Sequence, residues 1–397
     1  MIPKILVIIL DGVGVGELPD AYLYNDQGSN TLGNISKVVK NFGLNNLQKM
    51  GIGNIISIDS IPATEIPIAH FGKMAEKSKG KDSTTGHWEL MGLVTEKEFP
   101  TYPSGFPEEL LDKFLEFNSL NGYLGNKPAS GTEIIKELGE KHQQTGYPIV
   151  YTSADSVFQI AAHEAVIPLE RLYEICKVTR IQVCVGEHSV ARVIARPFLG
   201  EPGNYYRTPN RKDFSLKPNG KTLLDILYEN NILTIGIGKI EDLYAGMGLR
   251  HIVHTKSNLE GIKAIIQESR KVANGLILAN LVDFDQLYGH RNDPEGFAKA
   301  LEEFDAKLPE IIETLNSSDW LIITADHGND PITPSTDHSR EYVPILVYNK
   351  NIKTGKNIGI RKTFADLAKT IGNLFGLNTQ LNQLSGESFY HLIKSEN

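Results

Sequence analysis

The sequence contains little cysteine, no long apolar run and no excess of positive charge. Its two cysteines, Cys176 and Cys184, lack the number and the spacing of a disulfide framework or a zinc site, so we expect free thiols in a reducing compartment. No segment approaches the ~20 apolar residues of a membrane-spanning helix. The apolar run at the N-terminus ends on Asp11 and has no small-residue cleavage site, which argues against a signal peptide. We therefore expect a cytoplasmic protein that does not contact membranes.

The charge balance argues against a general surface for nucleic acids. Lysine and arginine number 40 and aspartate and glutamate 48, which gives a net charge of −8. Proteins that bind phosphate backbones have the opposite excess. Recognition of a phosphate group must then come from local arginines or from metal ions. The length of 397 residues exceeds the usual size of one hydrophobic core and predicts two domains.

Three apolar runs are predicted to be buried strands of a parallel sheet, and an acidic residue follows each of them. The runs are residues 4–10, 276–284 and 320–323, and the acids are Asp11, Asp285 and Asp326. One such acid is readily explained as a helix cap. Three alike, each before a turn that contains glycine, indicate a site, because the carboxyl ends of parallel strands share one edge of the sheet. We therefore expect the three carboxylates to converge.

Histidines accompany these acids at short range. His290 follows the second acid by five residues, His327 directly follows the third, and His338 lies on the loop beyond. Carboxylate oxygen and imidazole nitrogen are ligands of Mn²⁺, Zn²⁺ and related ions. Six such ligands suffice for two divalent ions, and two ions about 3.5–4 Å apart suit phosphoryl transfer. Asp337 is predicted to orient a neighbouring histidine and not to bind an ion.

A cluster of hydroxyl groups provides a candidate nucleophile. Ser83, Thr84 and Thr85 lie between Asp82 and a glycine. A hydroxyl beside a divalent cation can attack phosphorus at neutral pH, because the cation stabilises the alkoxide. The alternative is a capping cluster for a helix that opens at residues 88–91. The two interpretations are compatible, since a helix N-terminus also favours a bound phosphate. The residues together predict a dinuclear metal phosphotransferase or phosphohydrolase.

The domain boundaries follow from a change in composition. Residues 99–107 are dense in proline and aromatic residues, as domain junctions often are. We predict a core domain of residues 1–98 and 214–397, interrupted by a smaller α/β domain of residues 99–213. The elements expected within the insert are a helix at 166–176 and strands at 148–151, 180–185 and 189–197. The helices expected in the core include one over 31–50 and one over 294–315 that Pro309 kinks or splits.

Arginines of the insert are candidate phosphate ligands. Arg192 and Arg196 lie on a predicted strand, and Arg207 and Arg211 lie on a polar loop. A guanidinium group binds phosphate through two hydrogen bonds. The alternative for any one of them is an ordinary solvated surface arginine.

The order of these motifs resembles the alkaline phosphatase superfamily. The motifs are Asp11-Gly12, Asp82-Ser83-x-x-Gly86-His87, Asp285-x4-His290, Asp326-His327-Gly328 and His338. Within that superfamily the chain looks most like the phosphopentomutases, in segments 80–89, 151–159, 207–211, 282–291 and 337–344. The resemblance runs from Ile5 to Phe389. It implies an α/β fold, with an alkaline-phosphatase-like core of a mostly parallel sheet flanked by helices and an inserted smaller α/β cap.

The resemblance also implies two Mn²⁺ ions, although other divalent ions fit the same ligands. One ion is then held by Asp285, His290 and His338, and the other by Asp11, Asp326, His327 and the nucleophile. By motif position the nucleophile is Ser83, where phosphopentomutases usually have threonine. Thr84 and Thr85 stay open as alternatives.

The implied activity is that of a phosphopentomutase, an isomerase of the intramolecular phosphotransferase type. It interconverts ribose 1-phosphate and ribose 5-phosphate, or the 2-deoxyribose phosphates, through a phosphoserine and a 1,5-bisphosphate. A sugar bisphosphate would act as primer, and we expect a monomer. The residues that would face the sugar phosphate are Asp155, Arg192, Arg207 and Arg211 of the cap and Lys239 of the core. The alternatives are a cofactor-independent phosphoglycerate mutase, a metal-dependent phosphomonoesterase and a non-catalytic sugar-phosphate sensor.

Overall fold

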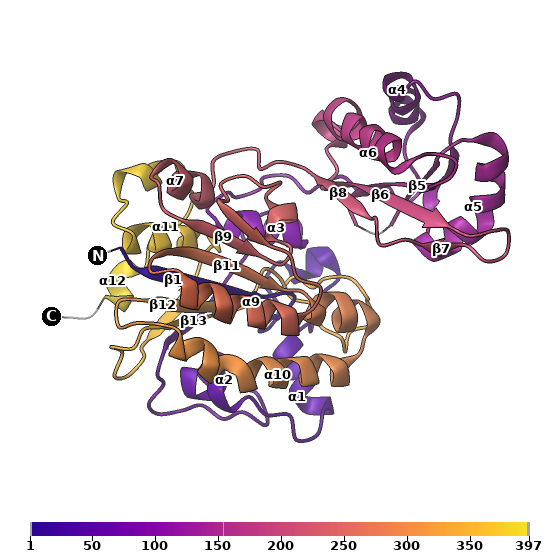
Figure 1. Cartoon of the computed structure of the whole chain (residues 1–397). Helices are drawn as coiled ribbons and strands as arrows, with labels where there is room; N and C mark the ends of the chain where they lie inside the picture. The colour runs from indigo at the N-terminus through magenta and orange to yellow at the C-terminus, as the bar shows by residue number, and fades with distance from the viewer. Residues whose placement is uncertain (1, 154, 395–397) are drawn as a thin grey trace. The chain divides into compact units, whose positions relative to one another are not determined.

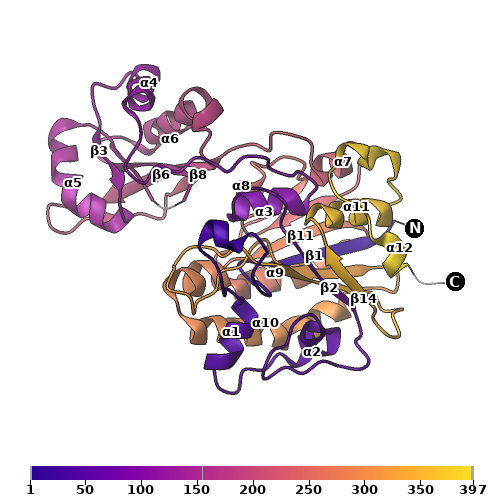
Figure 2. The ribbon, with the colours of Figure 1, turned by 180° about the vertical axis from the view of Figure 1, so that it is seen from behind.

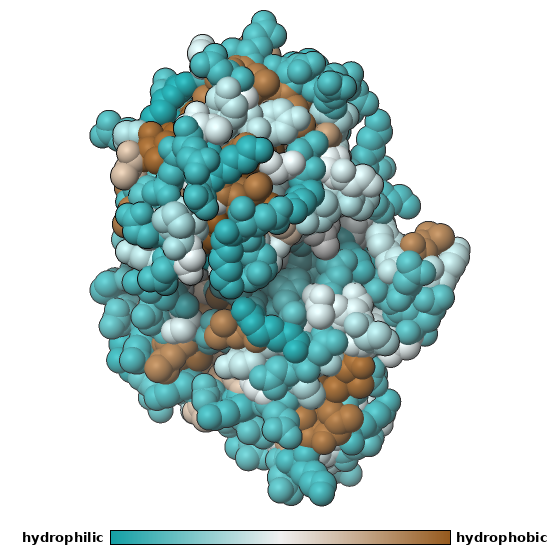
Figure 3. Space-filling model, turned by 90° about the vertical axis from the view of Figure 1, so that its right-hand side faces the viewer, coloured by the Kyte–Doolittle hydropathy of each residue, from teal (hydrophilic) through white to brown (hydrophobic). Residues whose placement is uncertain are grey.

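A computed structural model describes residues 2–153 and 155–394. The chain forms two compact units, one of Met1–Lys97 with Pro218–Asn397 and the other of Glu98–Lys217. The boundaries predicted from the sequence were 98/99 and 213/214. Among the described residues, no helix is both long enough and apolar enough to span a membrane. Figure 3 shows a face on which hydrophilic side chains predominate and hydrophobic ones form small separate groups.

The larger unit contains an eight-stranded sheet with the order β10-β9-β11-β1-β12-β13-β2-β14. Its strands are β1 (Lys4–Leu10), β2 (His70–Met74), β9 (Thr234–Ile237), β10 (His251–Val253), β11 (Gly275–Leu281), β12 (Trp320–Thr324), β13 (Val343–Tyr348) and β14 (Asn357–Arg361). The five strands from β10 to β12 are mutually parallel, and β13 is antiparallel to both of its neighbours. The predicted mostly parallel α/β sheet is thereby confirmed.

Helices cover both faces of this sheet (Figures 1 and 2). One group consists of α1 (Thr31–Val38), α2 (Asn45–Met50), α9 (Asn258–Lys271) and α10 (Pro294–Glu313), and the other of α3 (Ser83–Leu90), α7 (Leu223–Glu229), α8 (Ile240–Leu243) and α11 (Ala365–Leu374). Every residue of β1 is buried. This explains the uninterrupted apolar run, since a strand covered on both faces has no solvent side that would favour polar residues.

The register of the three central strands brings their carboxyl ends together. Leu10 of β1 pairs with Leu281 of β11, and Ile9 pairs with Thr324 of β12. The backbone N–H of Asp11 then donates to the carbonyl of Leu281 at 3.2 Å. The predicted convergence of three strand ends at one edge of the sheet is therefore present.

The smaller unit is built on a six-stranded sheet with the order β3-β4-β5-β6-β7, in which β8 also pairs with β6. Its strands are β3 (Leu124–Pro128), β4 (Ile149–Thr152), β5 (Val157–His163), β6 (Arg192–Leu199), β7 (Tyr206–Arg207) and β8 (Lys212–Ser215). Helices α4 (Glu108–Asn118) and α6 (Leu169–Val178) share one apolar core with the sheet, and α5 (Gly131–Thr145) shares a second one. Alternate residues of β5 point into the two cores, so this sheet is also covered on both faces.

Two of the predicted elements are wrong. Residues 180–185 do not form a strand, because α6 continues into a π-helical turn at Thr179–Val183. The Thr179 hydroxyl donates to the carbonyl of Ile175 at 2.7 Å, and Val183 packs into the same core as α6. Apolar runs of this length do not distinguish a strand from a buried helical turn.

The single helix expected over residues 31–50 is two helices, α1 and α2. The residues between them include Asn41, which has a left-handed φ of 60° that no helix interior accommodates. By contrast, α10 is continuous through Pro309. Proline removes the N–H that would bond to the carbonyl of Asp305. That carbonyl accepts instead from the side-chain amide of Asn46 at 2.8 Å, so it keeps a hydrogen-bond partner.

A buried arginine joins the segment after β12 to the loop that precedes α3. The guanidinium of Arg340 donates to both carboxylate oxygens of Asp20 at 3.0 and 3.2 Å, to Glu76 at 2.7 Å and to the carbonyl of Gly80 at 2.7 Å. Its side chain is only 2% exposed, and its guanidinium lies 5.0 Å from the ring of Tyr24. With the carbonyl of Glu76 at 3.1 Å, five acceptor atoms around one planar cation hold the two segments in a single relative position.

We predict that Arg340→Ala destabilises the larger unit by about 3–5 kcal/mol, because the buried carboxylate of Glu76 loses its counter-ion. The measurement is the free energy of unfolding from urea denaturation. Arg270→Ala is the matched control, since its ion pair with Glu310 spans 3.7 Å at the surface and is worth less than ~1 kcal/mol. Equal losses in the two variants would contradict the assigned role of Arg340.

Candidate metal centre

Three buried carboxylates lie at the carboxyl edge of the central strands. Asp11 directly follows β1, and Asp326 comes two residues after β12. Asp285 does not end its strand as the sequence suggested, because it lies on a π-helical turn (η5, Phe284–Tyr288) that follows β11. The backbone N–H of Gly12, which has a left-handed φ of 81°, lies 3.3 Å from the Asp326 carboxylate and donates to it. The turn after β1 thus brings two of the acids together.

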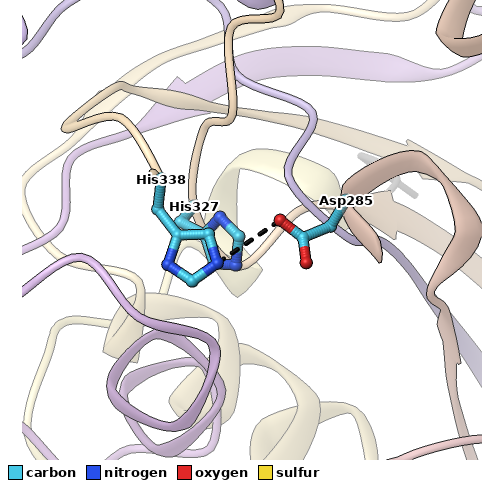
Figure 4. A group of neighbouring side chains, drawn as sticks. All are labelled: Asp285, His327 and His338. Atoms are coloured by element: carbon cyan, nitrogen blue, oxygen red, sulfur yellow. Dashed lines mark ion pairs between the residues drawn. The ribbon is translucent and has the colours of Figure 1, made fainter. Parts of the chain in front are cut away.

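His327 lies between the carboxylates. Its Nε2 is 3.3 Å from Asp11 Oδ1 and 3.3 Å from Asp326 Oδ2. The ring of His338 lies 4.1 Å from the ring of His327, centroid to centroid, and its Nε2 is 3.3 Å from Asp285 Oδ1. Figure 4 shows both imidazoles on the same side of Asp285. The five side chains form one continuous polar cluster.

Two groups of potential ligand atoms occur within this cluster, each with all its atoms within 4.8 Å of one another. One consists of Asp11, Asp326 and His327, and the other of Asp285, His327 and His338. His327 therefore belongs to both. His290 Nε2 lies 3.2 Å from Asp285 Oδ2, at the border of the second group. A further group in the smaller unit, Glu109, Glu187 and His188, is largely exposed.

The charges of the cluster suit divalent cations. Burial opposes ionisation of Asp285, but the facing His338 and His290 outweigh burial and hold its pKa well below the usual value. Burial likewise opposes protonation of His327, yet Asp326 and Asp11 raise its pKa well above the ordinary value. The facing imidazoles thus favour the charged form of the buried Asp285, and the carboxylates beside His327 favour a proton on that ring. A divalent cation would neutralise them without a proton.

Two carboxylate oxygens also lack hydrogen-bond donors. Asp11 Oδ1 and Asp326 Oδ2 are buried and, within the part of the chain that the structure describes, accept no hydrogen bond. A buried carboxylate oxygen without a donor is costly unless it binds a cation. The residues present therefore fit metal ions.

Ser83 is the first residue of α3, so the helix begins five residues earlier than expected. Its N-cap is Asp82, whose carboxylate accepts from the backbone N–H groups of Thr84 and Thr85 at 3.0 and 3.1 Å. Ser83 Oγ lies 3.1 Å from His327 Nε2. The Thr85 hydroxyl is buried and donates to Asp82 instead. Of these two hydroxyls, only that of Ser83 contacts the cluster.

The other predicted site residues are divided between the two units. Lys239 belongs to the larger unit, and its Nζ lies 3.8 Å from Asp11 Oδ2. In the smaller unit, Arg192 lies 3.5 Å from Asp155 and 3.7 Å from Asp213. Arg211 forms an ion pair with Asp213 at 2.7 Å, and Arg207 is exposed on β7. Asp337 Oδ1 lies 3.9 Å from His338 Nδ1 and also pairs with Lys81.

Two asparagines of the cluster were not predicted. Asn280 on β11 donates to Asp11 Oδ2 at 3.0 Å, and Asn329 donates to Asp285 Oδ1 at 2.7 Å. Asn280 is the only polar side chain between Leu276 and Val282, and a lone amide in a buried apolar strand is a signal that could have pointed to it. Asn329 has no such signal, because it lies in a polar loop.

The fold and the cluster define a class: an α/β metalloenzyme with its ligands at the carboxyl ends of parallel strands. A family model described as the metalloenzyme superfamily matches residues 3–379. The phosphoglycerate mutase of Leishmania mexicana has a similar fold, with a TM-score of 0.50 over 100% of this chain and 98% of that chain, at 12% identity. The chain is a member of the metalloenzyme superfamily.

Comparison with sequence relatives identifies the family within this superfamily. The chain is 60% identical over 391 residues to the phosphopentomutase of Dictyoglomus turgidum, which covers 98% of each protein. It is 56% identical over 386 residues to the phosphopentomutase of Acetivibrio thermocellus, which covers 97% of this chain and 98% of that protein. The chain belongs to the phosphopentomutase family.

We predict that chelation of divalent ions lowers the melting temperature and that Mn²⁺ restores it. A ligand at a hundred times its Kd stabilises the folded state by about 2.7 kcal/mol. The measurement is a thermal melt with EDTA and after addition of Mn²⁺. Asp326→Asn should lose most of the Mn²⁺-induced shift, whereas Glu109→Gln in the exposed group should keep it. A wild-type melt that does not respond to Mn²⁺ would contradict the assignment.

Proposed function

We propose that the chain interconverts ribose 1-phosphate and ribose 5-phosphate, and the corresponding 2-deoxyribose phosphates. Membership of the phosphopentomutase family supports this reaction. The observation that carries the chemistry is the position of Ser83, whose hydroxyl at a helix N-terminus lies 3.1 Å from His327. A nucleophile, a carboxylate cluster and a phosphate-favouring helix end thus meet at one point.

Two divalent ions are part of this proposal, and we propose that both are Mn²⁺. One is assigned to Asp285, His290 and His338, and the other to Asp11, Asp326, His327 and Ser83. When bound, the ions supply charge stabilisation on the oxygens of the transferring phosphoryl group. The ligand types support the assignment, since oxygen and nitrogen donors suit Mn²⁺.

The chain's own residues have separate roles in the transfer. Phosphorylated Ser83 transfers its phosphoryl group to the free hydroxyl of the sugar phosphate, so the bond from phosphorus to Ser83 Oγ breaks while one to the sugar forms. The resulting 1,5-bisphosphate then transfers its other phosphoryl group back to Ser83, and the remaining sugar monophosphate leaves as the isomer. The partial positive charge at the N-terminus of α3 favours the phosphate on Ser83, although the N–H groups of Thr84 and Thr85 already donate to Asp82. A sugar bisphosphate is proposed as the primer that phosphorylates an empty Ser83.

Recognition of the sugar phosphate is assigned to the smaller unit and to one lysine. Asp155 would accept from sugar hydroxyls, while Arg192, Arg207 and Arg211 would bind phosphate oxygens. Lys239 would contribute a positive charge beside Asp11. We propose that the smaller unit acts as a cap that excludes water, because water would hydrolyse the bisphosphate.

Two further assignments complete the proposal. Both cysteines are buried free thiols, which supports a reducing compartment such as the cytoplasm. We also propose that the protein is a monomer. A phosphoglycerate mutase is the second candidate, but the likeness to that enzyme extends to the fold alone, at 12% identity.

We predict that Ser83→Ala lowers mutase activity by more than about 1,000-fold. Without the covalent nucleophile, only substrate binding and electrostatic stabilisation would still contribute to catalysis. The measurements are conversion of ribose 1-phosphate and mass spectrometry of the enzyme after incubation with a sugar bisphosphate. Ser83→Thr keeps the hydroxyl and should retain activity.

Thr84→Val and Thr85→Val are the controls for this assignment. Both should still acquire one phosphate on Ser83, although Thr85→Val loses the bond to Asp82 and should be less stable. A phosphate that persists in Ser83→Ala and maps to Thr84 or Thr85 would overturn the choice of nucleophile.

We predict that Arg207→Ala raises KM by roughly 10-fold or more and leaves kcat within a few-fold, since one charge-assisted hydrogen bond is worth about 1.5–3 kcal/mol. The measurement is steady-state kinetics with ribose 5-phosphate. Lys136→Ala removes one positive charge from the same unit, where its partner is Glu133 at 3.0 Å. A KM shift of equal size in Lys136→Ala would show a general charge effect and contradict a direct contact.

A further inference from the structure

One buried histidine beside the metal cluster has no part in the assignments above. His87 lies on α3 four residues after Ser83, and its side chain is fully buried. Residues four apart in a helix lie on the same face, so its ring lies under the first turn. Within the described residues His87 belongs to neither group of ligand atoms that could hold an ion.

One nitrogen of His87 faces two oxygens. Its Nδ1 lies 2.8 Å from the carbonyl oxygen of Ser83 and 3.1 Å from Asp326 Oδ2. A carbonyl and an ionised carboxylate can only accept hydrogen bonds. Nδ1 therefore carries a proton, which it donates to the Ser83 carbonyl beside the Asp326 carboxylate.

The other nitrogen faces an amide that is itself oriented by the cluster. Asn280 Nδ2 donates to Asp11 Oδ2 at 3.0 Å and lies 3.4 Å from His87 Nε2. Because the Asp11 carboxylate only accepts, the NH₂ end of the amide must face it, and its second hydrogen is left for Nε2. Nε2 is thus placed to accept from the Asn280 amide, while Nδ1 is placed to donate to the Ser83 carbonyl.

The ring itself has a fixed position. The hydroxyl of Tyr244 donates to the backbone carbonyl of His87, and the two rings meet edge to face at 6.4 Å with an interplanar angle of 72°. The neighbouring Trp88 donates from Nε1 to the carbonyl of Leu243 at 2.9 Å. Both contacts attach α3 to α8 and its end, so the imidazole cannot rotate away from the cluster.

We propose that His87 is a positioning residue that aligns the nucleophile with the carboxylates assigned to its metal ion. It joins Ser83 to Asp326 through Nδ1 and to Asp11 through Asn280. This inference rests on the proposed role of Ser83 and goes beyond it, because His87 lies outside both described groups of possible ligand atoms. Its effect falls on the rate of phosphoryl transfer and on metal affinity, and not on binding of the sugar.

The test compares His87→Ala, His87→Asn and His87→Gln. The Asn amide nitrogen occupies the place of Nδ1 and can donate to the Ser83 carbonyl, whereas the Gln amide extends toward Nε2. We expect His87→Ala to lower kcat by about 100-fold, as misplacement of a reacting group by 1 Å does, with KM changed less than about 3-fold. His87→Asn should recover at least about 10-fold of that loss, and His87→Gln should not.

Calorimetric Mn²⁺ binding gives a readout that is independent of turnover. Loss of a group that orients a metal ligand costs about 10–100-fold in affinity, so we expect this loss in His87→Ala and a partial recovery in His87→Asn. This measurement separates the inference from the proposed function, since Mn²⁺ affinity does not depend on which sugar phosphate reacts.

His70→Ala is the matched control. His70 is a second buried histidine of the larger unit, and its Nδ1 accepts from the backbone N–H of Lys356 at 3.0 Å. This variant should lower the melting temperature and keep wild-type kcat and Mn²⁺ affinity. The proposal is overturned if His87→Ala keeps the wild-type kcat and Mn²⁺ affinity, or if His87→Gln recovers as much kcat as His87→Asn. It is also overturned if His70→Ala lowers kcat by the same factor as His87→Ala.

Discussion

The electrostatic repulsion among Asp11, Asp285 and Asp326 is the main constraint on the larger unit, because the neighbouring residues must offset it. Two unit charges about 4 Å apart repel by roughly 4 kcal/mol at an effective dielectric constant of 20, and the oxygens of Asp11 and Asp326 lie within 4.8 Å of each other. Burial makes the cost larger. The structure offsets it with donors from Asn280, Asn329 and the Gly12 backbone and with imidazoles. Divalent cations would complete this compensation.

The same constraint explains why α3 begins where it does. A helix N-terminus carries a partial positive charge, and the first residue of α3, Ser83, lies 3.1 Å from His327 within the acidic cluster. Asp82 caps the helix and holds Thr85, which leaves Ser83 beside His327. Arg340 then ties the preceding loop to the segment that carries the histidines. The proposed nucleophile and the candidate metal ligands are thereby held in one rigid part of the larger unit, as the proposed phosphoryl transfer requires for alignment.

Much of this arrangement could be predicted from the sequence, for an identifiable reason. A buried parallel strand must be apolar throughout, so an acid directly after such a run is conspicuous, and Asp11 and Asp326 were found this way. The errors arose where periodicity is ambiguous. Residues 180–185 are apolar enough for a strand, yet Thr179 holds them as a helical turn. Asp285 was expected at a strand end and lies on a π-helical turn, because residues 282–284 separate it from β11.

By itself, the sequence determined the chemistry available to this protein: the ligand types, the hydroxyl cluster, the apolar strands and the family. These are properties of residue type and local spacing. Only the tertiary structure decided which groups meet. It placed Ser83 rather than Thr85 against the cluster, gave His327 a position in both groups of ligands and brought Asn280 to His87. The physical reason is that strand register sets distances between residues that lie hundreds of positions apart, and no local pattern encodes them.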